Sequence, residues 1–409
     1  MSLKKFGEVC DFVRGPFGGS LKKSCFVEEG YAVYEQQHAI YNQFTQIRYF
    51  VDEDKFNEMK RFELKPNDLI MSCSGTMGKV AIVPDCVKRG IINQALLKLT
   101  PKEFLDVEYL RYWMSSPDFD ARIEENTVGA AIKNVASVKI LKQIDVPIPP
   151  LPEQQQIVAL LDQAFAAIDQ AKANIDKNIE NATSLFQSKL NDIFSQKGEG
   201  WEEKKLLELG RVQTGTTPPT KEKSYYGDFI PFVKPPHFQK DGSIDIGSSM
   251  LSEKGLKKGR LFEENSILMV CIGATIGKTG FSKIPVSANQ QINALTPKKE
   301  YHPKVLYYAL ISDIFFNKVL KNSSQATLPM INKSKWQNLS VNIPVKFDTQ
   351  IEIVTLLDEF RIKVDKIKIQ YLKKLESLEE LKKSILQKAF AGELTKEFSV
   401  SREQLAVIT

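Results

Sequence analysis

The chain repeats itself at an offset of about 196 residues, and this duplication constrains its fold more than any other feature. The hexapeptide that begins at Ile157 (IVALLD) returns at Ile353 (IVTLLD), and Gln154 returns as Gln350. Matches at several separate places with one common spacing indicate a duplicated unit, which has to be recognised before any single motif is interpreted. We therefore expect two copies of one globular domain, each followed by a helix.

The helical part of each copy carries an apolar stripe. From Ile157 onward, apolar or small residues recur at steps of three and four, and the position 196 residues later is again apolar or aromatic. This spacing predicts an amphipathic helix of about 40 residues, which needs a partner surface for stability. The first stripe is rich in alanine and the second in larger side chains, so we expect the two helices to pack on each other. The alternative is that each helix merely covers its own domain.

The globular halves have the pattern of mixed α/β domains. Short β-rich runs begin at Leu69, Val80, Ile230 and Ile267, between turns of Gly, Pro and Asp. Amphipathic helices are expected near residues 107–113 and 304–316. The predicted organisation is a first domain (1–150), a long helix (151–197), a second domain (198–347), a second long helix (348–396) and a C-terminal tail (397–409).

Composition excludes several classes of protein. Of 409 residues, 42% are hydrophobic and 26% charged, which is typical of a globular protein. The net charge of +6 permits a polyanionic partner. Five cysteines without CxxC spacing and three histidines make a zinc site or a disulfide framework unexpected, and favour a reducing cytoplasm. No apolar run approaches the length of a membrane span, and no signal peptide is expected.

Both copies contain a glycine turn that ends in Gly-Lys, at Gly78-Lys79 and at Gly277-Lys278. A nucleotide-binding P-loop requires G-x-x-x-x-G-K-[ST], and its first glycine would fall at Ile272. A duplicated tight turn between two strands explains both copies better than a nucleotide site. The lysine after each turn is a candidate phosphate contact, and an ordinary solvated lysine is the alternative.

No complete catalytic motif occurs in the chain. Amino-methyltransferases resemble each other in an [NDS]-P-P-[YFW] tetrapeptide, and the nearest segments begin at Pro149 (PPL) and Lys234 (KPPH). Neither segment has Asn, Asp or Ser in first place or Tyr, Phe or Trp in last place. A G-x-S-x-G elbow and an H-E-x-x-H pair are also missing from the sequence. We therefore expect no catalytic centre, no metal site and no cofactor site on this chain.

Polar, basic and aromatic loop residues remain as the candidates for function. Such side chains can reach the edges of bases and the phosphates of a duplex. The loops differ between the copies, so the scaffold repeats while the surface expected to contact the ligand does not. The candidate DNA-binding residues are Arg14, Lys22, Lys23, Gln36, His38, Lys79, Lys88, Arg89, Thr216, Lys234, His237, Lys240 and Lys278.

The whole arrangement resembles the specificity (S) subunit of type I restriction–modification enzymes. The resemblance rests on the GPFG segment at Gly15, the two Gly-Lys turns and the stretch from Pro147 to Ile157 (PIPPLPEQQQI). That stretch is similar to the family's passage from a target-recognition domain into a conserved helix. The second copy keeps Pro344 and Gln350 but lacks the Leu-Pro-Glu segment.

The resemblance implies two α/β (α+β) target-recognition domains in a pseudo-twofold arrangement, joined and separated by two long antiparallel coiled-coil helices. Each domain would bind one half of a bipartite double-stranded DNA site, and the helices would set the spacing. Two methyltransferase (M) subunits would dock on the helices and bring S-adenosylmethionine. Restriction (R) subunits would bring ATP, magnesium and DNA cleavage.

On this reading the chain is a cytoplasmic, non-catalytic subunit of an adenine-N6 methyltransferase and endonuclease complex, without contact with a membrane. Two alternatives stay open. The chain could be a tandem-repeat scaffold whose ligand is a protein, or a self-contained DNA methyltransferase. Salt-sensitive binding to a DNA duplex would argue against the protein-binding scaffold. Methyl transfer by the isolated chain would favour the self-contained methyltransferase.

Overall fold

The computed structural model describes residues 2–17, 19–74, 76–127, 138–239, 241–324 and 328–394. Its contacts divide the chain into two compact units. Unit 1 is formed by residues 1–174 and 373–409, and unit 2 by residues 175–372. Each unit therefore contains one globular domain and a part of each long helix. We call residues 2–150 domain 1 and residues 198–346 domain 2.

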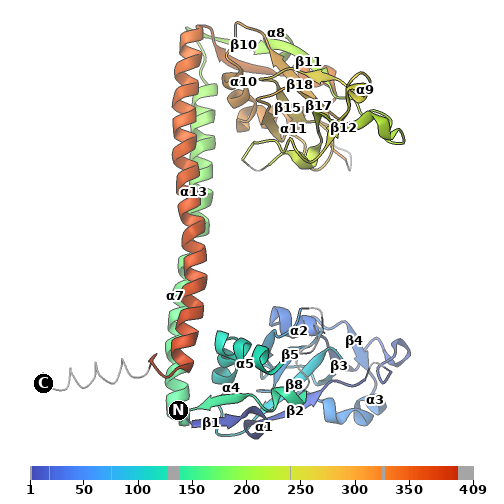
Figure 1. Ribbon diagram of the computed structural model, residues 1–409, viewed down its shortest axis with the longest axis vertical. Helices are drawn as coiled ribbons and strands as arrows, with labels where there is room; N and C mark the ends of the chain where they lie inside the picture. The colour runs from blue at the N-terminus through green and yellow to red at the C-terminus, as the bar shows by residue number, and fades with distance from the viewer. Residues whose placement is uncertain are drawn as a thin grey trace, which may run out of the picture. The chain divides into compact units, whose positions relative to one another are not determined.

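The two long helices are α7 (Leu151–Phe194) and α13 (Phe347–Phe390), each of 44 residues. Within unit 1, the Lys172 ammonium lies 2.6 Å from the Glu379 carboxylate, and the Lys382 ammonium lies 4.6 Å from the centre of the Phe165 ring. Residues later in α7 thus contact residues earlier in α13, so the helices are antiparallel. Figure 1 shows α7 beside α13. The expected packing of one helix on the other is confirmed.

The same helices also complete the cores of the domains. Ile157 and Leu161 of α7 are fully buried in the core of domain 1, together with Ala389 of α13. In unit 2, Leu357 of α13 and Leu190 of α7 are fully buried in the core of domain 2. Burying one such leucine stabilises the fold by about 1.5–3 kcal/mol. Each domain is therefore closed by the beginning of one long helix and the end of the other.

The predicted stripe is buried only in part. Leu185, Ile367 and Leu381 belong to it, yet their exposed fractions are 57%, 42% and 47%. A helix has 3.6 residues per turn, so a series of steps of three and four drifts around its surface. Because the partner helix covers one face only, some members of the series point to solvent.

Domain 1 is a mixed α/β domain (Figure 1). Its strands are β1 (Ser2–Lys5), β2 (Cys10–Arg14), β3 (Tyr31–Tyr34), β4 (Tyr49–Val51), β5 (Leu69–Ser72), β6 (Val80–Ile82), β7 (Gly90–Ile92), β8 (Leu96–Pro101) and β9 (Asp145–Ile148). Its helices are α1 (Phe6–Val9), α2 (Gln36–Tyr41), α3 (Glu53–Glu58), α4 (Val107–Trp113), α5 (Pro117–Thr127) and α6 (Val138–Leu141).

Domain 2 has the same kinds of element in nearly the same order. Its strands are β10 (Trp201–Lys205), β11 (Gly210–Thr214), β12 (Tyr226–Val233), β13 (Met250–Leu251), β14 (Leu261–Phe262), β15 (Ile267–Val270), β16 (Thr279–Phe281), β17 (Val286–Ala288), β18 (Ile292–Pro297) and β19 (Ser340–Pro344). Its helices are α8 (Leu206–Leu209), α9 (Glu253–Leu256), α10 (Pro303–Leu310), α11 (Asp313–Asn322) and α12 (Lys333–Gln337).

The sheets repeat strand by strand. Domain 1 contains an antiparallel sheet in the order β2-β8-β5-β6, and domain 2 contains the order β11-β18-β15-β16. A second sheet pairs β3 with β7 in parallel, as β12 pairs with β17. A third pairs β1 with β9, as β10 pairs with β19. The mixed α/β class and the duplication are therefore confirmed.

One predicted helix is divided in two. Residues 304–316 were expected to be continuous, but α10 ends at Leu310 and α11 begins at Asp313. The Ser312 side chain accepts a hydrogen bond from the Phe315 backbone N–H at 3.3 Å, which is the interaction of a helix N-cap. The serine therefore starts a new helix and lets the chain change direction.

Candidate nucleic-acid interface

In domain 1, several loops gather at one edge of the sheets. The Gly15 N–H donates to the Leu96 carbonyl at 2.9 Å, and the Asn93 N–H donates to the Tyr34 carbonyl at 2.9 Å. The Cys73 N–H donates to the carbonyl of the turn before β8 at 2.8 Å. Segments that follow β2, β3 and β5 therefore lie beside the turn between β7 and β8. We call this group, residues 15–17, 35–38, 73–74, 76–79 and 93–95, loop edge 1.

Domain 2 builds the same edge with the same backbone bonds. The Gly215 N–H donates to the Ile292 carbonyl at 2.9 Å, and the Asn289 N–H donates to the Val233 carbonyl at 3.0 Å. The Cys271 N–H donates to the carbonyl of the turn before β18 at 2.8 Å. We call residues 215–217, 234–237, 271–278 and 289–291 loop edge 2. A Cβ atom on either first glycine would lie about 2 Å from a backbone oxygen, so this close approach requires glycine.

The two Gly-Lys turns also have matching backbone angles and hydrogen bonds. Gly78 and Gly277 have φ values of 76° and 85°, a conformation that favours glycine. The Lys79 carbonyl accepts from the Ser72 N–H at 2.9 Å, and the Lys278 carbonyl accepts from the N–H of the matching strand residue at 2.9 Å. Both lysine side chains are exposed. The expectation of a duplicated tight turn agrees with this geometry.

Lys278 also borders a groove between domain 2 and the long helices. The groove has a volume of about 370 Å³ and includes Arg361 and Lys368 of α13 and Asp241 of domain 2. Three cationic side chains therefore border the groove together with two carboxylates, those of Asp241 and Asp365, and Arg361 is paired with Asp365 at 3.8 Å.

Other basic candidates are spread over domain 1. Arg14, Lys22 and Lys23 are exposed on β2 and on the segment after loop edge 1. Lys88 and Arg89 precede β7 and lie at the end of that strand opposite to the loop edge. The Arg89 guanidinium forms an ion pair of 2.7 Å with Glu63, which neutralises its charge. The structure therefore does not bring this pair together with the loop edge.

Two candidates of domain 1 are buried or half-buried. The His38 side chain is fully buried, where its Nδ1 accepts from the Glu35 N–H at 2.9 Å and its Nε2 lies 3.1 Å from the Gln46 carbonyl. With both nitrogens engaged, this ring cannot donate to a base, and the prediction for His38 is corrected. Gln36 is half-buried, and its side-chain oxygen is enclosed without a hydrogen-bond partner among the described residues.

In domain 2, Thr216, Lys234 and His237 belong to loop edge 2, and Lys240 lies outside the described residues. The His237 Nδ1 accepts from the Lys234 N–H at 3.3 Å, and its Nε2 lies 3.1 Å from the Ser248 hydroxyl. Burial lowers the pKa of His237, Lys234 lowers it further, and Asp245 opposes the shift. The ring is therefore neutral at physiological pH and offers no charge to a phosphate.

Loop edge 2 also contains a cavity that the search for charged residues missed. It has a volume of about 460 Å³ and is lined by Thr217, Thr220, Tyr226, Phe232, Lys234, Asn289 and Gln290. The Thr217 hydroxyl donates to the Gln290 side-chain oxygen. The Asn-Gln pair recurs at Asn93, so the sequence carried a signal for this site. That signal identified the repeat, whereas the side chains around the cavity come from separate segments, namely the loop after β11, β12 with the residue that follows it, and the turn before β18.

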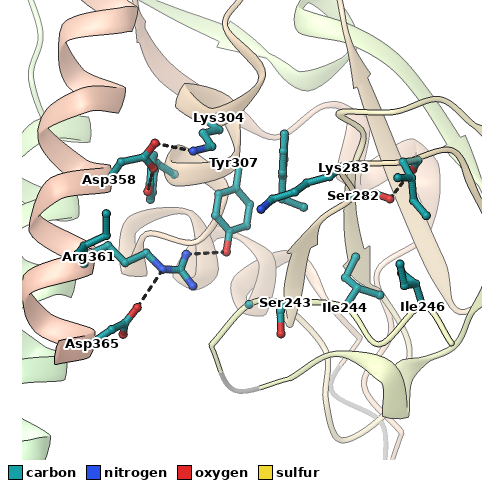
Figure 2. Close-up of a pocket in the computed structure, with 15 residues that line it drawn as sticks. Ser243, Ile244, Ile246, Ser282, Lys283, Lys304, Tyr307, Asp358, Arg361 and Asp365 are labelled. Atoms are coloured by element: carbon teal, nitrogen blue, oxygen red, sulfur yellow. Dashed lines mark hydrogen bonds and ion pairs between the residues drawn. The ribbon is translucent and has the colours of Figure 1, made fainter. Parts of the chain in front are cut away.

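A larger cavity, of about 500 Å³, lies between domain 2 and α13. Figure 2 shows Lys304 beside Asp358, and Arg361 between Tyr307 and Asp365. The Lys304 ammonium lies 2.5 Å from the Asp358 carboxylate, and the Arg361 guanidinium donates to the Tyr307 hydroxyl at 3.2 Å. These contacts join the helix to the domain. Among the described residues, no group of three His, Cys, Asp or Glu side chains is arranged to hold a metal ion.

Within the described part of the chain, no helix combines the length and the apolar character needed to cross a bilayer. The two long helices have charged residues along their exposed faces.

Comparison with known proteins agrees with the duplicated fold. The family described as the type I restriction modification DNA specificity domain matches residues 1–181 and again residues 198–378. The chain is 24% identical over 352 residues to the MjaIX specificity subunit of a type I restriction enzyme from Methanocaldococcus jannaschii, covering 80% of this chain and 77% of that protein. The HindI specificity subunit from Haemophilus influenzae is 28% identical over 199 residues, which span 48% of this chain and 42% of that protein.

Two solved structures share the fold. One is a chain of a type I R-M system, studied for complex assembly and conformational transition, with a TM-score of 0.71, 19% identity and coverage of 96% of this chain and 98% of that chain. The other is the HsdS subunit from Thermoanaerobacter tengcongensis, with a TM-score of 0.57, 18% identity and coverage of 96% and 97%. Because the family matches both halves of the sequence over most of their length, the protein belongs to the specificity-subunit family of type I restriction–modification systems.

Proposed function

We propose that each domain binds one half of a bipartite double-stranded DNA site through its loop edge. The observation that carries this proposal is the pair of loop edges, which share their backbone bonds and differ in their side chains. A scaffold that presents two different polar loop sets is suited to two different base sequences.

Lys79 and Lys278 are proposed as phosphate contacts. Each is exposed after a turn with matching hydrogen bonds, and neither forms an ion pair among the described contacts. An unpaired ammonium in this position supplies a positive charge that attracts the phosphates of any sequence alike.

The partners proposed for the chain are two methyltransferase subunits and the restriction subunits. The methyltransferase subunits would supply S-adenosylmethionine, and the restriction subunits would supply ATP-driven cleavage. The exposed apolar residues of α7 and α13 support a role of the long helices in docking, because single helices rarely expose several large apolar side chains without a partner. The site of action would be the cytoplasm, where the DNA is accessible.

Retardation of a DNA duplex at several salt concentrations tests the proposal. The chain with its methyltransferase subunits should bind duplexes, and the logarithm of its affinity should fall linearly with the logarithm of the salt concentration. Lys79→Ala and Lys278→Ala should each weaken binding to all sequences about equally and reduce the salt slope by roughly one unit. Lys65→Ala and Lys299→Ala are matched controls, because both side chains are exposed at strand ends opposite to the loop edges.

The alternatives predict other results. A protein-binding scaffold would show no salt-dependent retardation of DNA. A self-contained methyltransferase would transfer a labelled methyl group to DNA without partner subunits, whereas we expect transfer only when the methyltransferase subunits are added.

A further inference from the structure

We propose that Gln94 and Gln290 contact a base at the same place in each half-site, and that two neighbouring residues in each domain select the adjoining bases. The selecting residues are Phe17 and Glu35 in domain 1, and Thr217 and Lys234 in domain 2. This inference rests on the proposed DNA-binding function and names the residues that would give the two domains different specificities.

The backbone makes the two glutamines equivalent. Each follows an asparagine whose side-chain oxygen accepts a hydrogen bond from the N–H two residues later, at 3.0 Å for Asn93 and 3.1 Å for Asn289. The asparagine is thus used to hold the turn. The glutamine that follows is exposed in both domains. A glutamine amide can pair with the N6 and N7 positions of adenine in the major groove.

The neighbouring positions are equivalent by the same backbone bonds. The Asn93 N–H donates to the carbonyl of the residue before Glu35. In the same way, the Asn289 N–H donates to the carbonyl of the residue before Lys234. Phe17 and Thr217 each come two residues after the glycine whose N–H donates to the carbonyl of the first residue of β8 or β18. The frame therefore places different chemistry at the same two positions.

In domain 2, the contacts show a site of defined chemistry. Thr217, Lys234 and Gln290 line one cavity of about 460 Å³, and the Thr217 hydroxyl already holds the Gln290 side-chain oxygen. This bond leaves the amide N–H₂ to face a ligand. The Lys234 ammonium lies 5.3 Å from the centre of the Phe232 ring, which positions it on the cavity wall. A lysine is a donor only and matches the acceptors O6 and N7 of guanine.

In domain 1 the same positions have the opposite character. Phe17 is 93% exposed, and an exposed phenyl ring can contact the methyl group of thymine. The Glu35 carboxylate is an acceptor and matches the N4 amino group of cytosine. Reversing the charge at Glu35 or at Lys234 should therefore interchange cytosine and guanine in the half-site of that domain only.

The test is selection of bound sequences from a randomised duplex library by the complex of this chain with its methyltransferase subunits. Lys234→Glu should change guanine to cytosine at one position of one half-site and leave the other half-site unchanged. Glu35→Lys should make the reverse change in the other half-site. Gln290→Ala should reduce discrimination at the adjacent position by roughly ten- to hundredfold.

Matched controls occupy equivalent positions away from the loop edges. Glu103→Lys and Lys299→Glu carry the same charge changes on exposed residues beyond β8 and β18, and both should preserve the wild-type motif. Lys234→Gln avoids a charge reversal and should replace guanine by adenine if Lys234→Glu does not fold. Variants that bind with the wild-type motif would overturn the inference. A wild-type complex that enriches no bipartite motif would instead overturn the proposed function.

Discussion

Domains 1 and 2 are most alike where they meet the long helices and least alike at their loop edges. At the helix junctions, Gln154 and Gln350 are both fully buried and both donate to a proline carbonyl at 2.9 Å. At the loop edges, domain 1 has an exposed phenylalanine at the position where domain 2 has a threonine. Buried hydrogen bonds fix the frame of each copy, whereas the exposed side chains of the loops can change at little cost in folding.

The largest effect is expected at the junction glutamines. Gln154 forms three hydrogen bonds, to Asp106, Phe104 and Pro149, and Gln350 forms two, to His302 and Pro344. Replacing either by alanine leaves buried backbone groups unpaired, at about 1–3 kcal/mol for each group. We expect Gln154→Ala to lower the free energy of unfolding by about 3 kcal/mol and Gln350→Ala by about 2 kcal/mol.

Thiol labelling in urea can assign each loss to its unit. Cys271 is buried in unit 2, and Cys73 is buried in unit 1. In a background where Cys25 and Cys86 are serine, Gln154→Ala should speed labelling in unit 1, and Gln350→Ala should speed labelling of Cys271. The exposed Gln155→Ala is the control. If both substitutions lower the free energy of unfolding by the same amount, the third hydrogen bond of Gln154 contributes nothing to stability.

A smaller effect is expected at the tyrosines that join each domain to a long helix. The Tyr112 hydroxyl donates to the Asp162 carboxylate, and the Tyr308 hydroxyl donates to Asp358 at 2.5 Å. Tyr112→Phe and Tyr308→Phe should each lower the free energy of unfolding by about 1 kcal/mol. Asp358 also pairs with Lys304, so Lys304→Met should change the effect of Tyr308→Phe, as interacting residues are not additive.

The contribution of the Tyr112 hydroxyl to the free energy of unfolding should depend on pH. Burial and the bond to Asp162 raise the pKa of Tyr112 to about 12, from an ordinary value of 10. Because the folded state favours the protonated phenol, this contribution is complete below pH 10 and is lost as the pH rises toward 12. The difference in unfolding free energy between wild type and Tyr112→Phe should therefore be smaller at pH 11 than at pH 8. A difference that is constant with pH would contradict this assignment.

The smallest effect is expected at the contacts between the two long helices, which differ in kind between unit 1 and unit 2. In unit 1, Lys172 pairs with Glu379, whose side chain is 59% exposed. In unit 2, the Phe186 ring stacks on the Phe360 ring with centroids 6.2 Å apart. Lys172→Met should cost less than about 1 kcal/mol, and the cost should vanish in 1 M salt. Phe360→Leu should be insensitive to salt, and equal salt sensitivity of the two variants would contradict this difference.

Much of the fold follows from local sequence patterns. The apolar steps that start at Ile157 and return at Ile353 predicted both long helices, because tertiary packing of a helix requires such a stripe. The break between α10 and α11 was missed, although Ser312 before an acidic residue is a typical start signal for a helix. The exposure of Leu185 was also missed, because a stripe does not reveal how wide the partner surface is.

The candidate site was harder to predict from sequence. The turn lysines, Lys79 and Lys278, were selected as candidates because the repeat placed them alike, and they remain a prediction. His38 was misassigned, since a histidine that caps a helix inside the core has the same local sequence as one in an exposed loop. The cavity around Gln290 was missed because its walls come from segments up to 73 residues apart in the chain, and only the folded sheet brings them together.

The two domains are proposed to read separate half-sites across a spacer set by the paired helices, and a matched insertion in both helices tests this most directly. Four residues added after Ala171 and four after Glu379 lengthen each helix at the level of the Lys172–Glu379 contact, by about 6 Å and a little over one turn. Selection of bound duplexes should return both original half-sequences, separated by one or two additional unspecified base pairs at about 3.4 Å each. Binding at the original spacing by a folded insertion variant would contradict the proposal.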